Sequence, residues 1–579
     1  MSTFTHRPTI RAKKYLVSSV HYLASMAGMQ ILERGGNAAD AGVAVGLCIN
    51  VLETELVHFG GVAPIIYCPG SGGPVETISG LGRWPQASSL DYFRQHHDND
   101  MSFGVLRCVT PAAPDAWLTA LARFGTMTFA EVVQPALDLA ENGRSVDQRF
   151  LDAISHDETL NWPSTAEIFR PNGRFPQLGD LHFQKDLART FRRLIAAEAL
   201  AGGGREAGLQ AARDLVYKGE IAEEMIAFHQ EQGGLLTLDD LANFSVQVEP
   251  PAHIHYKGYD VYSCGAWCQG PAFLMLLKLL EGVDLVSMGH NSTDYLHTLV
   301  EAVKLVMADR EAFIGDPEFV QVPLAGLLDG QYWAERRQAI EMESAMPNMP
   351  ASGNPWPHQA EPRGEWGPLP KTFGTNRVAA PPTPERDTSY VSVVDQWGNT
   401  FSATPSDGFG SSPIVPGLGF PISARGSQSW LENDHPSSVA AGKRPRLTPN
   451  PALVLKNGRP VMAIGTPGAD AQIQAMAQVF LNMVEFGMEP QAAIEAPRII
   501  SRSFPQTFWP HESYPAEAII ETRISAAVRD EMRQRGHVLL EDGAWSKKVS
   551  RVCTIVTDPE TGTKAGGADP RTTGYAVGW

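Results

Sequence analysis

Residues 346–386 interrupt the chain with a stretch rich in proline and glycine that has no sustained hydrophobic period. Inside a compact protein such a stretch is a linker or a functional loop. The pattern is mainly helical over residues 110–330 and becomes β after the stretch. We therefore predict a helix-rich region with core strands over residues 1–345, a linker over 346–387 and a second region over 388–579. With 579 residues, we also expect two or more packed layers or lobes.

Helical periodicity is clearest in two apolar segments. Residues 38–51 form a largely apolar segment that follows a Gly-Gly-Asn turn signal, which predicts a helix. Further along, a second helix is predicted with Glu301, Lys304 and Arg310 outside its apolar stripe. That stripe consists of Leu296, Leu299, Val300, Val303 and Met307.

Two β-hairpins are predicted after the linker. Residues 390–395 and 400–404 are strand-like and are joined by the turn at 396–399. A second hairpin spans residues 452–465, with Asn457-Gly458 as its turn. Its outgoing strand runs through Gly465-Thr466-Pro467-Gly468 into a helix, an arrangement that presents free backbone N–H groups to an anion. The alternative interpretation is a tight strand-to-helix turn, which is compatible with that role.

Composition excludes several classes of protein. A formal charge of −17 argues against a nucleic-acid binder. Residues 1–15 carry positive charge but lead into no apolar signal-peptide core, and the apolar run 41–51 is too short to span a bilayer. Six cysteines form neither a disulfide framework nor a zinc spacing, so we expect buried thiols. We expect a soluble, cytoplasmic protein without a membrane or nucleic-acid partner.

Familiar catalytic motifs are missing from the sequence. It contains no Gly-x-Ser-x-Gly elbow, no P-loop and no His-Glu-x-x-His, and Gly80-Leu81-Gly82 lacks the third glycine of a dinucleotide site. Sixteen histidines are scattered along the chain, and we interpret His21, His58 and His290 as structural. We therefore expect no metal and no cofactor.

Thr388 is the residue at which the chemistry could reside. A threonine hydroxyl has too high a pKa to act as a nucleophile without an adjacent base. A threonine at a chain terminus carries that base itself, because a free α-amino group has a pKa of about 7.7–8.0. Cleavage between Asp387 and Thr388, where the linker meets a strand, would create such a terminus. Judged by these residues alone, a threonine that simply opens a strand is the commoner interpretation.

An ordered set of short motifs favours the interpretation of Thr388 as a nucleophile. The segment from Thr388 to Asp395, followed by Gly398-Asn399, resembles the start of the small subunit of γ-glutamyltransferases. The resemblance covers nearly the whole chain. Other matching segments, in the family's order, are Gly35-Gly36-Asn37-Ala38, Gly289-His290-Asn291-Ser292, Ala308-Asp309-Arg310, Gly315-Asp316-Pro317, Gly442-Lys443-Arg444-Pro445, Gly465-Thr466-Pro467-Gly468, Ala496-Pro497-Arg498 and Ala568-Asp569-Pro570-Arg571.

The resemblance implies a fold and a mechanism. It implies an α+β fold, a four-layer αββα sandwich of N-terminal-nucleophile hydrolase type, built from two chains derived from one precursor. Thr388 corresponds to the nucleophile, and cleavage falls between Asp387 and Thr388. Gly468 and Ala469 correspond to the two glycines whose N–H groups form the oxyanion hole, and alanine keeps its N–H. The implied partners are the two fragments themselves, as a heterodimer, and a small amide substrate.

The departures from the family concern substrate binding. Leu81 stands where typical members have the arginine that binds the substrate α-carboxylate, although Arg83 lies two residues on. The stretch that binds the α-amino group is replaced by residues 423–428, which contain Arg425. Arg425 with Arg83 could clamp one carboxylate; a structural salt bridge is the alternative for Arg425. The remaining candidate substrate-binding residues are Gln428, Ser406, Asp407 and Thr448.

These departures indicate a divergent branch, near oxamate amidohydrolase and glutaryl-cephalosporin acylases. We expect hydrolysis of a small carboxylate-bearing amide through an acyl-enzyme. Two alternatives stay open: a true γ-glutamyl transferase or glutathione hydrolase, and an unprocessed, non-catalytic binding protein with the same fold.

Overall fold

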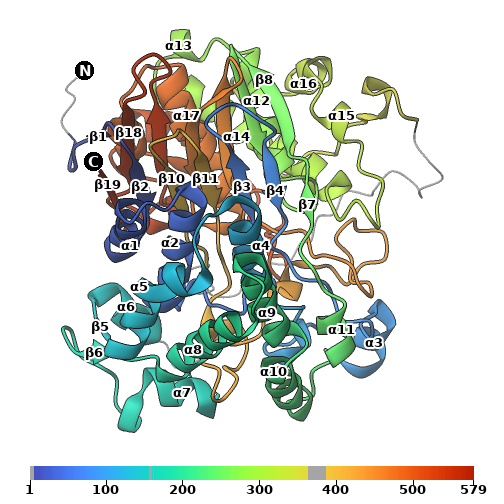
Figure 1. The fold of residues 1–579 in the computed structure, drawn as a ribbon. Helices are drawn as coiled ribbons and strands as arrows, with labels where there is room; N and C mark the ends of the chain where they lie inside the picture. The colour runs from blue at the N-terminus through green and yellow to red at the C-terminus, as the bar shows by residue number, and fades with distance from the viewer. Residues whose placement is uncertain (1–4, 156–159, 161, 363–386) are drawn as a thin grey trace.

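Two seven-stranded antiparallel sheets form the centre of the molecule (Figure 1). The structure, a computed structural model, describes residues 5–155, 160, 162–362 and 387–579. The first sheet has the order β1 (Ile10–Ala12), β18 (Lys564–Ala568), β17 (Cys553–Thr557), β13 (Arg459–Gly465), β12 (Ala452–Lys456), β9 (Tyr259–Ser263) and β8 (Ala252–Tyr256). The second has the order β19 (Tyr575–Gly578), β2 (Leu16–Ser19), β10 (Val391–Val394), β11 (Thr400–Ala403), β3 (Ile65–Cys68), β4 (Glu76–Ile78) and β7 (Val248–Glu249).

The two sheets pack face to face between layers of helices. β10 and β11 of the second sheet contact β13 of the first, and β2 contacts β17 and β18. On the outer face of the second sheet lie α1 (Tyr22–Glu33) and α2 (Ala38–Leu52). The outer face of the first sheet is covered by α12 (Gly270–Glu281), α17 (Gln472–Val484) and α18 (Pro490–Glu495). The predicted αββα sandwich is confirmed.

The remaining elements surround this sandwich. Much of the helical segment before β7 lies below it in the view of Figure 1. This segment comprises α3 (Leu90–His96), α4 (Ala113–Phe124), α5 (Phe129–Asn142), α6 (Gln148–Ile154), α7 (Pro163–Phe169), α8 (Lys185–Leu200), α9 (Arg205–Tyr217), α10 (Glu220–Glu231) and α11 (Leu238–Ala242), with the small sheet of β5 (Arg144–Ser145) and β6 (Leu181–His182). Elsewhere lie α13 (Leu285–Met288), α14 (Thr293–Phe313), α15 (Leu324–Leu327), α16 (Gly330–Arg337), α19 (Ala526–Gln534) and a sheet of β14 (Ile499–Ser501), β15 (Glu517–Ile520) and β16 (Val538–Glu541).

Local sequence signals locate several of these elements correctly. α2 begins after Asn37, whose side chain accepts from the Asp40 N–H while Asp40 accepts from the Asn37 N–H, a capping box. Both predicted hairpins are confirmed: β10 pairs with β11, and β12 pairs with β13. No helix among the described residues is long and apolar enough to span a bilayer. All six cysteines are buried free thiols.

α14 is a helix as predicted, but it is buried on every side. Glu301, Lys304 and Arg310, which lie outside the apolar stripe, are all fully buried. Lys304 Nζ lies 2.7 Å from Glu301 Oε1, and Arg310 pairs with Glu311. A charged helix face is buried only when its charges are paired, and α12, α19 and β14 enclose α14 here.

Both sheets contain strands from before and after the predicted linker. β10, which opens the region 388–579, lies between β2 and β11 and is buried along its whole length. The two predicted regions therefore share one core. Of the predicted linker, residues 346–362 and Asp387 are described and include a short 3₁₀ helix, Trp356–His358; residues 363–386 lie outside the described residues, and the boundaries stay predictions.

Candidate active site

Thr388 lies buried just before β10, in contact with a serine from a neighbouring loop. Its Oγ1 is 2.7 Å from Ser406 Oγ and also donates to the Asp387 carbonyl. The backbone φ of Thr388 is 153°, in a region that side-chain-bearing residues rarely adopt. Such a conformation persists only where its surroundings enforce it, and it stores about 1–3 kcal/mol of strain. The strain falls beside the bond predicted to break.

The loop that carries Ser406 is held in place by backbone hydrogen bonds. The Ser406 N–H donates to the Val62 carbonyl at 3.0 Å, and the Val62 N–H donates to the Ser406 carbonyl at 3.2 Å. On the other side, the Ser389 N–H donates to the Pro405 carbonyl at 2.9 Å. The Ser389–Pro405 bond continues the pairing of β10 with β11, and the Ser406–Val62 bonds continue the pairing of β11 with β3. Together they hold the Ser406 hydroxyl against Thr388.

Arg425 begins a short 3₁₀ helix, Arg425–Gln428, and points into this cluster. Its side chain is 1% exposed. Nη2 lies 2.8 Å from Asp387 Oδ1 and donates to Ser406 Oγ at 2.5 Å. Nε lies 3.7 Å from Asp407 Oδ2, and the Phe508 ring lies 5.4 Å from the guanidinium carbon. Sequence reasoning predicted Arg425, Ser406 and Asp407 at one site, and the structure brings all three together.

Two buried titratable residues, Asp407 and His58, lie beside Arg425. Burial raises the pKa of Asp407 to about 7, although Arg425 opposes that rise. Ser423 Oγ donates to Asp407 Oδ2 at 2.6 Å. His58 Nε2 lies 3.9 Å from Asp407 Oδ1, and burial with the charge of Arg425 holds the pKa of His58 well below its usual range. His58 is therefore a neutral imidazole at pH 7.

An acidic pair that sequence reasoning missed lies on the other side of Thr388. Ser389 Oγ donates to Glu53 Oε2 at 2.7 Å, and Arg149 Nη1 lies 2.5 Å from Glu53 Oε1. Burial raises the pKa of nearby Glu55 to about 7, with Arg149 opposing it. A signal was present: Glu53 and Glu55 follow a largely apolar helix, where burial of an acid is rare unless the acid has a partner.

The predicted anion-binding turn follows β13. Gly468 has φ 126° and is half-buried, and Ala469 has φ 51° and is buried. In the part of the chain that the structure describes, neither of their N–H groups donates to another protein group. Gly465, three residues earlier, packs directly on the Tyr390 ring, because a Cβ there would lie 2.1 Å from that ring. The turn therefore adjoins the strand that Thr388 opens.

A match to a family model covers almost all of the elements described above. Residues 24–579 match the model described as gamma-glutamyltranspeptidase. The chain belongs to the gamma-glutamyltranspeptidase family. The family shares an N-terminal-nucleophile hydrolase fold of mixed helices and antiparallel sheets, and processing into two chains is typical of it.

Relatives in the gamma-glutamyltranspeptidase family include both glutathione hydrolases and acylases. The chain is 30% identical over 575 residues to the glutathione hydrolase-like YwrD proenzyme of Bacillus subtilis (strain 168), covering 98% of each chain. It superposes on "Structure of LmbA2991HD" with a TM-score of 0.90 at 36% identity, covering 100% of both chains. For the cephalosporin acylase of Bacillus halodurans the TM-score is 0.84 at 26% identity, covering 100% of this chain and 98% of that one.

A buried network of charged side chains adjoins the Gly468–Ala469 turn of this gamma-glutamyltranspeptidase-family protein. Asp470, next to Ala469, lies 2.5 Å from Arg310 Nη1 and accepts from the Thr507 N–H at 2.9 Å. Arg310 also binds Glu311, whose two oxygens each lie 2.8 Å from Arg446 Nη2. Burial raises the pKa of Glu311, but Arg446 and Arg310 outweigh it and hold that pKa well below the usual range. The network therefore stays charged at neutral pH and holds the start of α17 rigid.

The other predicted substrate-binding residues lie apart from the Arg425 cluster. Gln428 Nε2 donates to Thr448 Oγ1 at 2.8 Å, and the backbone N–H of Thr448 donates to Gln428 Oε1 at 3.2 Å, so the Gln428 side chain binds Thr448 twice. Gln269 Nε2 donates to the carbonyls of both Thr448 and Ala469 at 2.9 Å and so links this pair to the turn.

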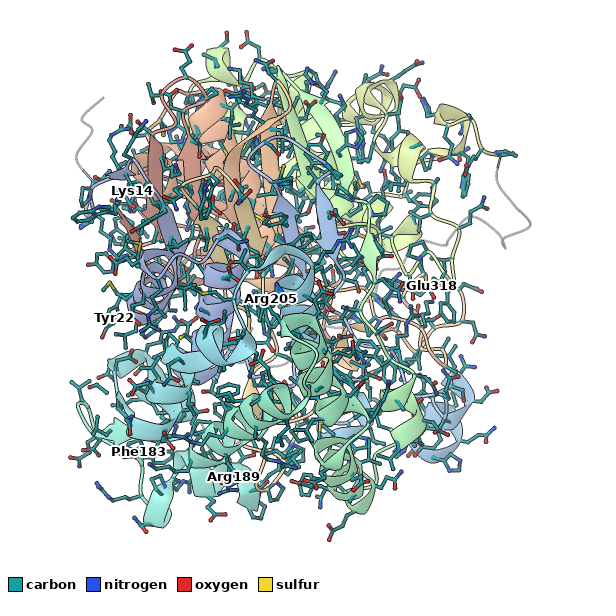
Figure 2. All side chains as sticks on the ribbon, viewed as in Figure 1. Lys14, Tyr22, Phe183, Arg189, Arg205 and Glu318 are labelled. Atoms are coloured by element: carbon teal, nitrogen blue, oxygen red, sulfur yellow. The ribbon has the colours of Figure 1, made fainter. Side chains whose placement is uncertain are left out.

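Arg83 is engaged elsewhere. Its Nη2 lies 2.6 Å from Glu318 Oε1, and its Nη1 donates to the Gly442 carbonyl at 2.9 Å. Figure 2 labels Glu318, whose side chain is 49% exposed, towards the right side of the view. Among the described residues, no hydrogen bond or ion pair joins Arg83 to Arg425, Ser406 or Thr388. The two-arginine clamp is not formed in this structure.

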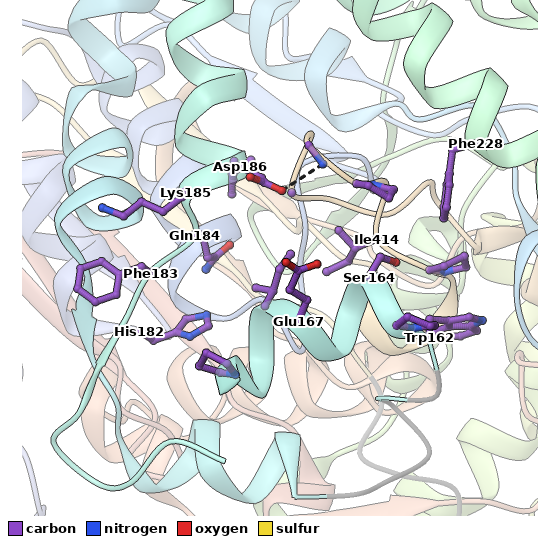
Figure 3. A pocket seen from close by; sticks show the side chains of 18 of the residues that line it. Trp162, Ser164, Glu167, His182, Phe183, Gln184, Lys185, Asp186, Phe228 and Ile414 are labelled. Atoms are coloured by element: carbon purple, nitrogen blue, oxygen red, sulfur yellow. Dashed lines mark hydrogen bonds between the residues drawn. The ribbon is translucent and has the colours of Figure 1, made fainter. Parts of the chain in front are cut away.

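A cavity of about 680 Å³ lies among the helices below the sandwich (Figure 3). Its walls include Trp162, Glu167 and His182 on one side and the loop 413–419 on the other. The Gly417 N–H donates to Asp186 at 3.1 Å across its rim. The loop belongs to the segment that joins Gly408 to Arg425, but none of the predicted site residues lines the cavity.

Proposed function

We propose that this protein is a self-processing amide hydrolase that uses Thr388 as an N-terminal nucleophile. The observation that carries the proposal is the position of the Thr388 hydroxyl, which lies against the Asp387 carbonyl and 2.7 Å from Ser406 Oγ. The proenzyme name of the Bacillus subtilis relative supports self-processing. The experiment that tests it compares the intact mass of the purified protein with that of the Thr388→Ala variant.

Self-cleavage would begin at the strained Asp387–Thr388 peptide. Thr388 Oγ attacks the Asp387 carbonyl carbon, and an N→O shift converts the amide to an ester. Water then adds to the ester and breaks the bond to Thr388 Oγ, which leaves a new α-carboxylate at Asp387. Ser406 is placed to accept or donate a proton at Thr388 Oγ, and Arg425 supports the Ser406 hydroxyl from the other side.

Turnover of a substrate would use the same hydroxyl with a new base. The free α-amine of Thr388 takes the hydroxyl proton, and Oγ attacks the substrate amide. The unpartnered N–H groups of Gly468 and Ala469 are suited to hold the oxyanion, where one donor contributes about 2.7–4 kcal/mol in a measured protease. The amine passes its proton to the leaving amine, and water releases the acyl group from Thr388.

The substrate we propose is a small amide that carries a carboxylate. Arg425 is buried, points to the scissile bond and offers planar donors to an anion. The acylase relative supports hydrolysis of an acyl amide. The glutathione hydrolase-like relative favours a second candidate, a γ-glutamyl hydrolase or transferase. Assays with a γ-glutamyl anilide, with and without a dipeptide acceptor, separate transfer from hydrolysis.

Arg425→Ala should reduce the activity of the processed enzyme selectively. A hydrogen bond to a charged group contributes about 1.5–3 kcal/mol, so we expect kcat/KM to fall roughly 10- to 150-fold for amides with an acyl carboxylate. For neutral amides of the same size we expect less than about a three-fold fall. The measurement is kcat/KM for paired anionic and neutral substrates.

The matched control is Arg83→Ala, since Arg83 is bound to Glu318 instead. It should leave the ratio of the two kcat/KM values unchanged. Equal losses on anionic and neutral amides in the Arg425 variant would show that Arg425 only supports the structure.

The pH dependence of turnover should report the α-amine of Thr388. An amine with a pKa of about 7.7–8.0 is the active base only when deprotonated, so kcat/KM should rise as pH passes through that range. Asp407 and Glu55, each with a pKa raised to about 7 by burial, become charged over a neighbouring range. The rise should therefore persist in Asp407→Asn and in Glu55→Gln; its disappearance in either variant would identify that carboxylate as the base.

A further inference from the structure

Both oxygens of the Asp387 side-chain carboxylate have partners in the site. Its Oδ1 lies 2.8 Å from Arg425 Nη2, and its Oδ2 accepts from the Gly408 N–H at 2.8 Å. The side chain of Asp387 is 12% exposed. An ion pair with Arg425 at Oδ1 and a backbone donor at Oδ2 thus hold both oxygens of the residue whose carbonyl Thr388 would attack.

The backbone at Gly408 packs closely against this carboxylate. A Cβ on Gly408 would lie 2.2 Å from the Glu55 carbonyl oxygen and 3.4 Å from Asp387 Cβ, so only glycine fits there without a shift. The Phe508 ring faces the guanidinium of Arg425. The loop that carries Phe508 binds both the Gly468–Ala469 turn and the 3₁₀ helix of Arg425. The Thr507 N–H donates to Asp470, next to the turn, and the Trp509 N–H donates to the Ser427 carbonyl in the 3₁₀ helix.

If Asp387 moves out of the site after cleavage, Arg425 loses its nearest carboxylate. Nε and Nη1 of Arg425 are buried and make no hydrogen bond in the described part of the chain. The remaining carboxylate near Arg425 is that of Asp407, but its Oδ2 lies 3.7 Å from Nε, too far for a hydrogen bond. Buried guanidinium N–H groups without hydrogen-bond acceptors are costly, so the emptied site favours an incoming carboxylate.

We infer that Asp387 is a built-in copy of the substrate's acyl group, and that the processed enzyme takes monoamides of a four-carbon dicarboxylic acid. This rests on the proposed function and names its substrate class. In Asp387 the scissile carbonyl carbon is followed by Cα, Cβ and the carboxylate carbon, which is the skeleton of a succinyl group. A substrate ⁻OOC–CH₂–CH₂–CO–NH–R reproduces these atoms, with Arg425 and the Gly408 N–H on its carboxylate.

The reaction balances without a further reactant. Thr388 Oγ bonds to the acyl carbon, the C–N bond breaks, and the leaving amine takes the proton that the α-amine received from the hydroxyl. Water then adds to the succinyl ester, the Oγ–C bond breaks, and the hydroxyl regains a proton as succinate leaves. Until cleavage occurs, Asp387 occupies the pocket and excludes substrate.

Acyl-chain length in the processed enzyme tests the copied skeleton. Malonyl, succinyl, glutaryl and uncharged butyryl 4-nitroanilides share one leaving group and differ only in the acyl part. We expect the succinyl compound to have a kcat/KM at least roughly 10-fold above its malonyl and glutaryl neighbours and about 100-fold above butyryl. Glutaryl, malonyl or butyryl as the best substrate would overturn the inference and leave the hydrolase intact; no cleavage of any anilide or other amide would instead contradict the proposed function.

A binding measurement tests occupancy by Asp387 without relying on turnover. Succinate is titrated by calorimetry into the processed protein, and formate, which reproduces only the carboxylate, into the uncut Thr388→Ala chain and the uncut double variant Asp387→Ala/Thr388→Ala. We expect succinate to bind to the processed protein, and formate to bind the double variant at least roughly 10-fold more tightly than the single variant, whose Asp387 carboxylate fills the site. Equal binding of formate to the two uncut variants, or no binding of succinate to the processed protein, would overturn the inference.

Discussion

Thr388→Ala should yield a single uncut chain of 62.9 kDa, whereas the unaltered protein should separate into fragments that end at Asp387 and begin at Thr388. The physical reason is that alanine lacks the oxygen that attacks the Asp387 carbonyl and has no counterpart of the hydroxyl that contacts Ser406. The measurement is the intact mass under denaturing conditions, followed over time after purification.

Amide hydrolysis should be lost together with cleavage. Loss of a nucleophile that works as a unit with its base costs about 10⁶-fold in kcat in a measured serine protease, so activity should fall to background. Thr388→Ser is the matched control, because it keeps an oxygen at the same position and should still cleave, more slowly. Complete cleavage of the alanine variant would remove Thr388 from the mechanism, and an unaltered chain that stays uncut would favour the non-catalytic binding protein.

Glu311→Ala should destabilise the protein by about 3–5 kcal/mol, the range for removing one partner of a buried ion pair. Glu311 is 1% exposed and binds Arg310, Arg446 and His435. Its removal leaves two buried guanidinium groups with too few anions. Because the pKa of Glu311 lies well below its usual range, the stabilisation is present at neutral pH and is lost only as pH falls through that lowered pKa.

The measurement is the urea midpoint in the Thr388→Ala background, where every sample is one uncut species. Glu220→Ala is the control: Glu220 pairs with Arg193 on the surface, with its side chain 79% exposed, and its loss should change the free energy of unfolding by at most about 0.5 kcal/mol. A loss below about 1 kcal/mol for Glu311 would show that the surrounding groups reorganise or admit water.

Short-range patterns were sufficient to locate the elements that carry the site. The Asn457-Gly458 turn and its flanking apolar residues predicted the hairpin of β12 and β13, and the glycine-rich exit predicted the turn before α17. The same holds for β10 and β11, where the turn and the partial alternation lie within 15 residues. In each case the signal is local, because turn conformation and strand or helix period depend on neighbouring residues.

The sequence was a poorer guide to which charged side chains are buried and which partners they bind. α14 has an apolar stripe that is typical of a half-buried helix, yet its charged face is enclosed as well, because α12, α19 and β14 cover it. Arg425, with Arg83 as a second member, was predicted to clamp one carboxylate, but Arg425 binds Asp387 and Arg83 binds Glu318. Neither outcome follows from spacing along the chain.

The sequence by itself determined the family motifs, the hairpins, the strand-to-helix turn and the candidate residues Thr388, Ser406, Asp407 and Arg425. The tertiary structure alone decided which of these meet, and it added His58, Glu53, Glu55 and Arg149 to their surroundings. The contact between Ser389 and Glu53 spans 336 positions. Such contacts arise because burial in a shared core forces each buried polar group to find a partner, wherever in the chain that partner lies.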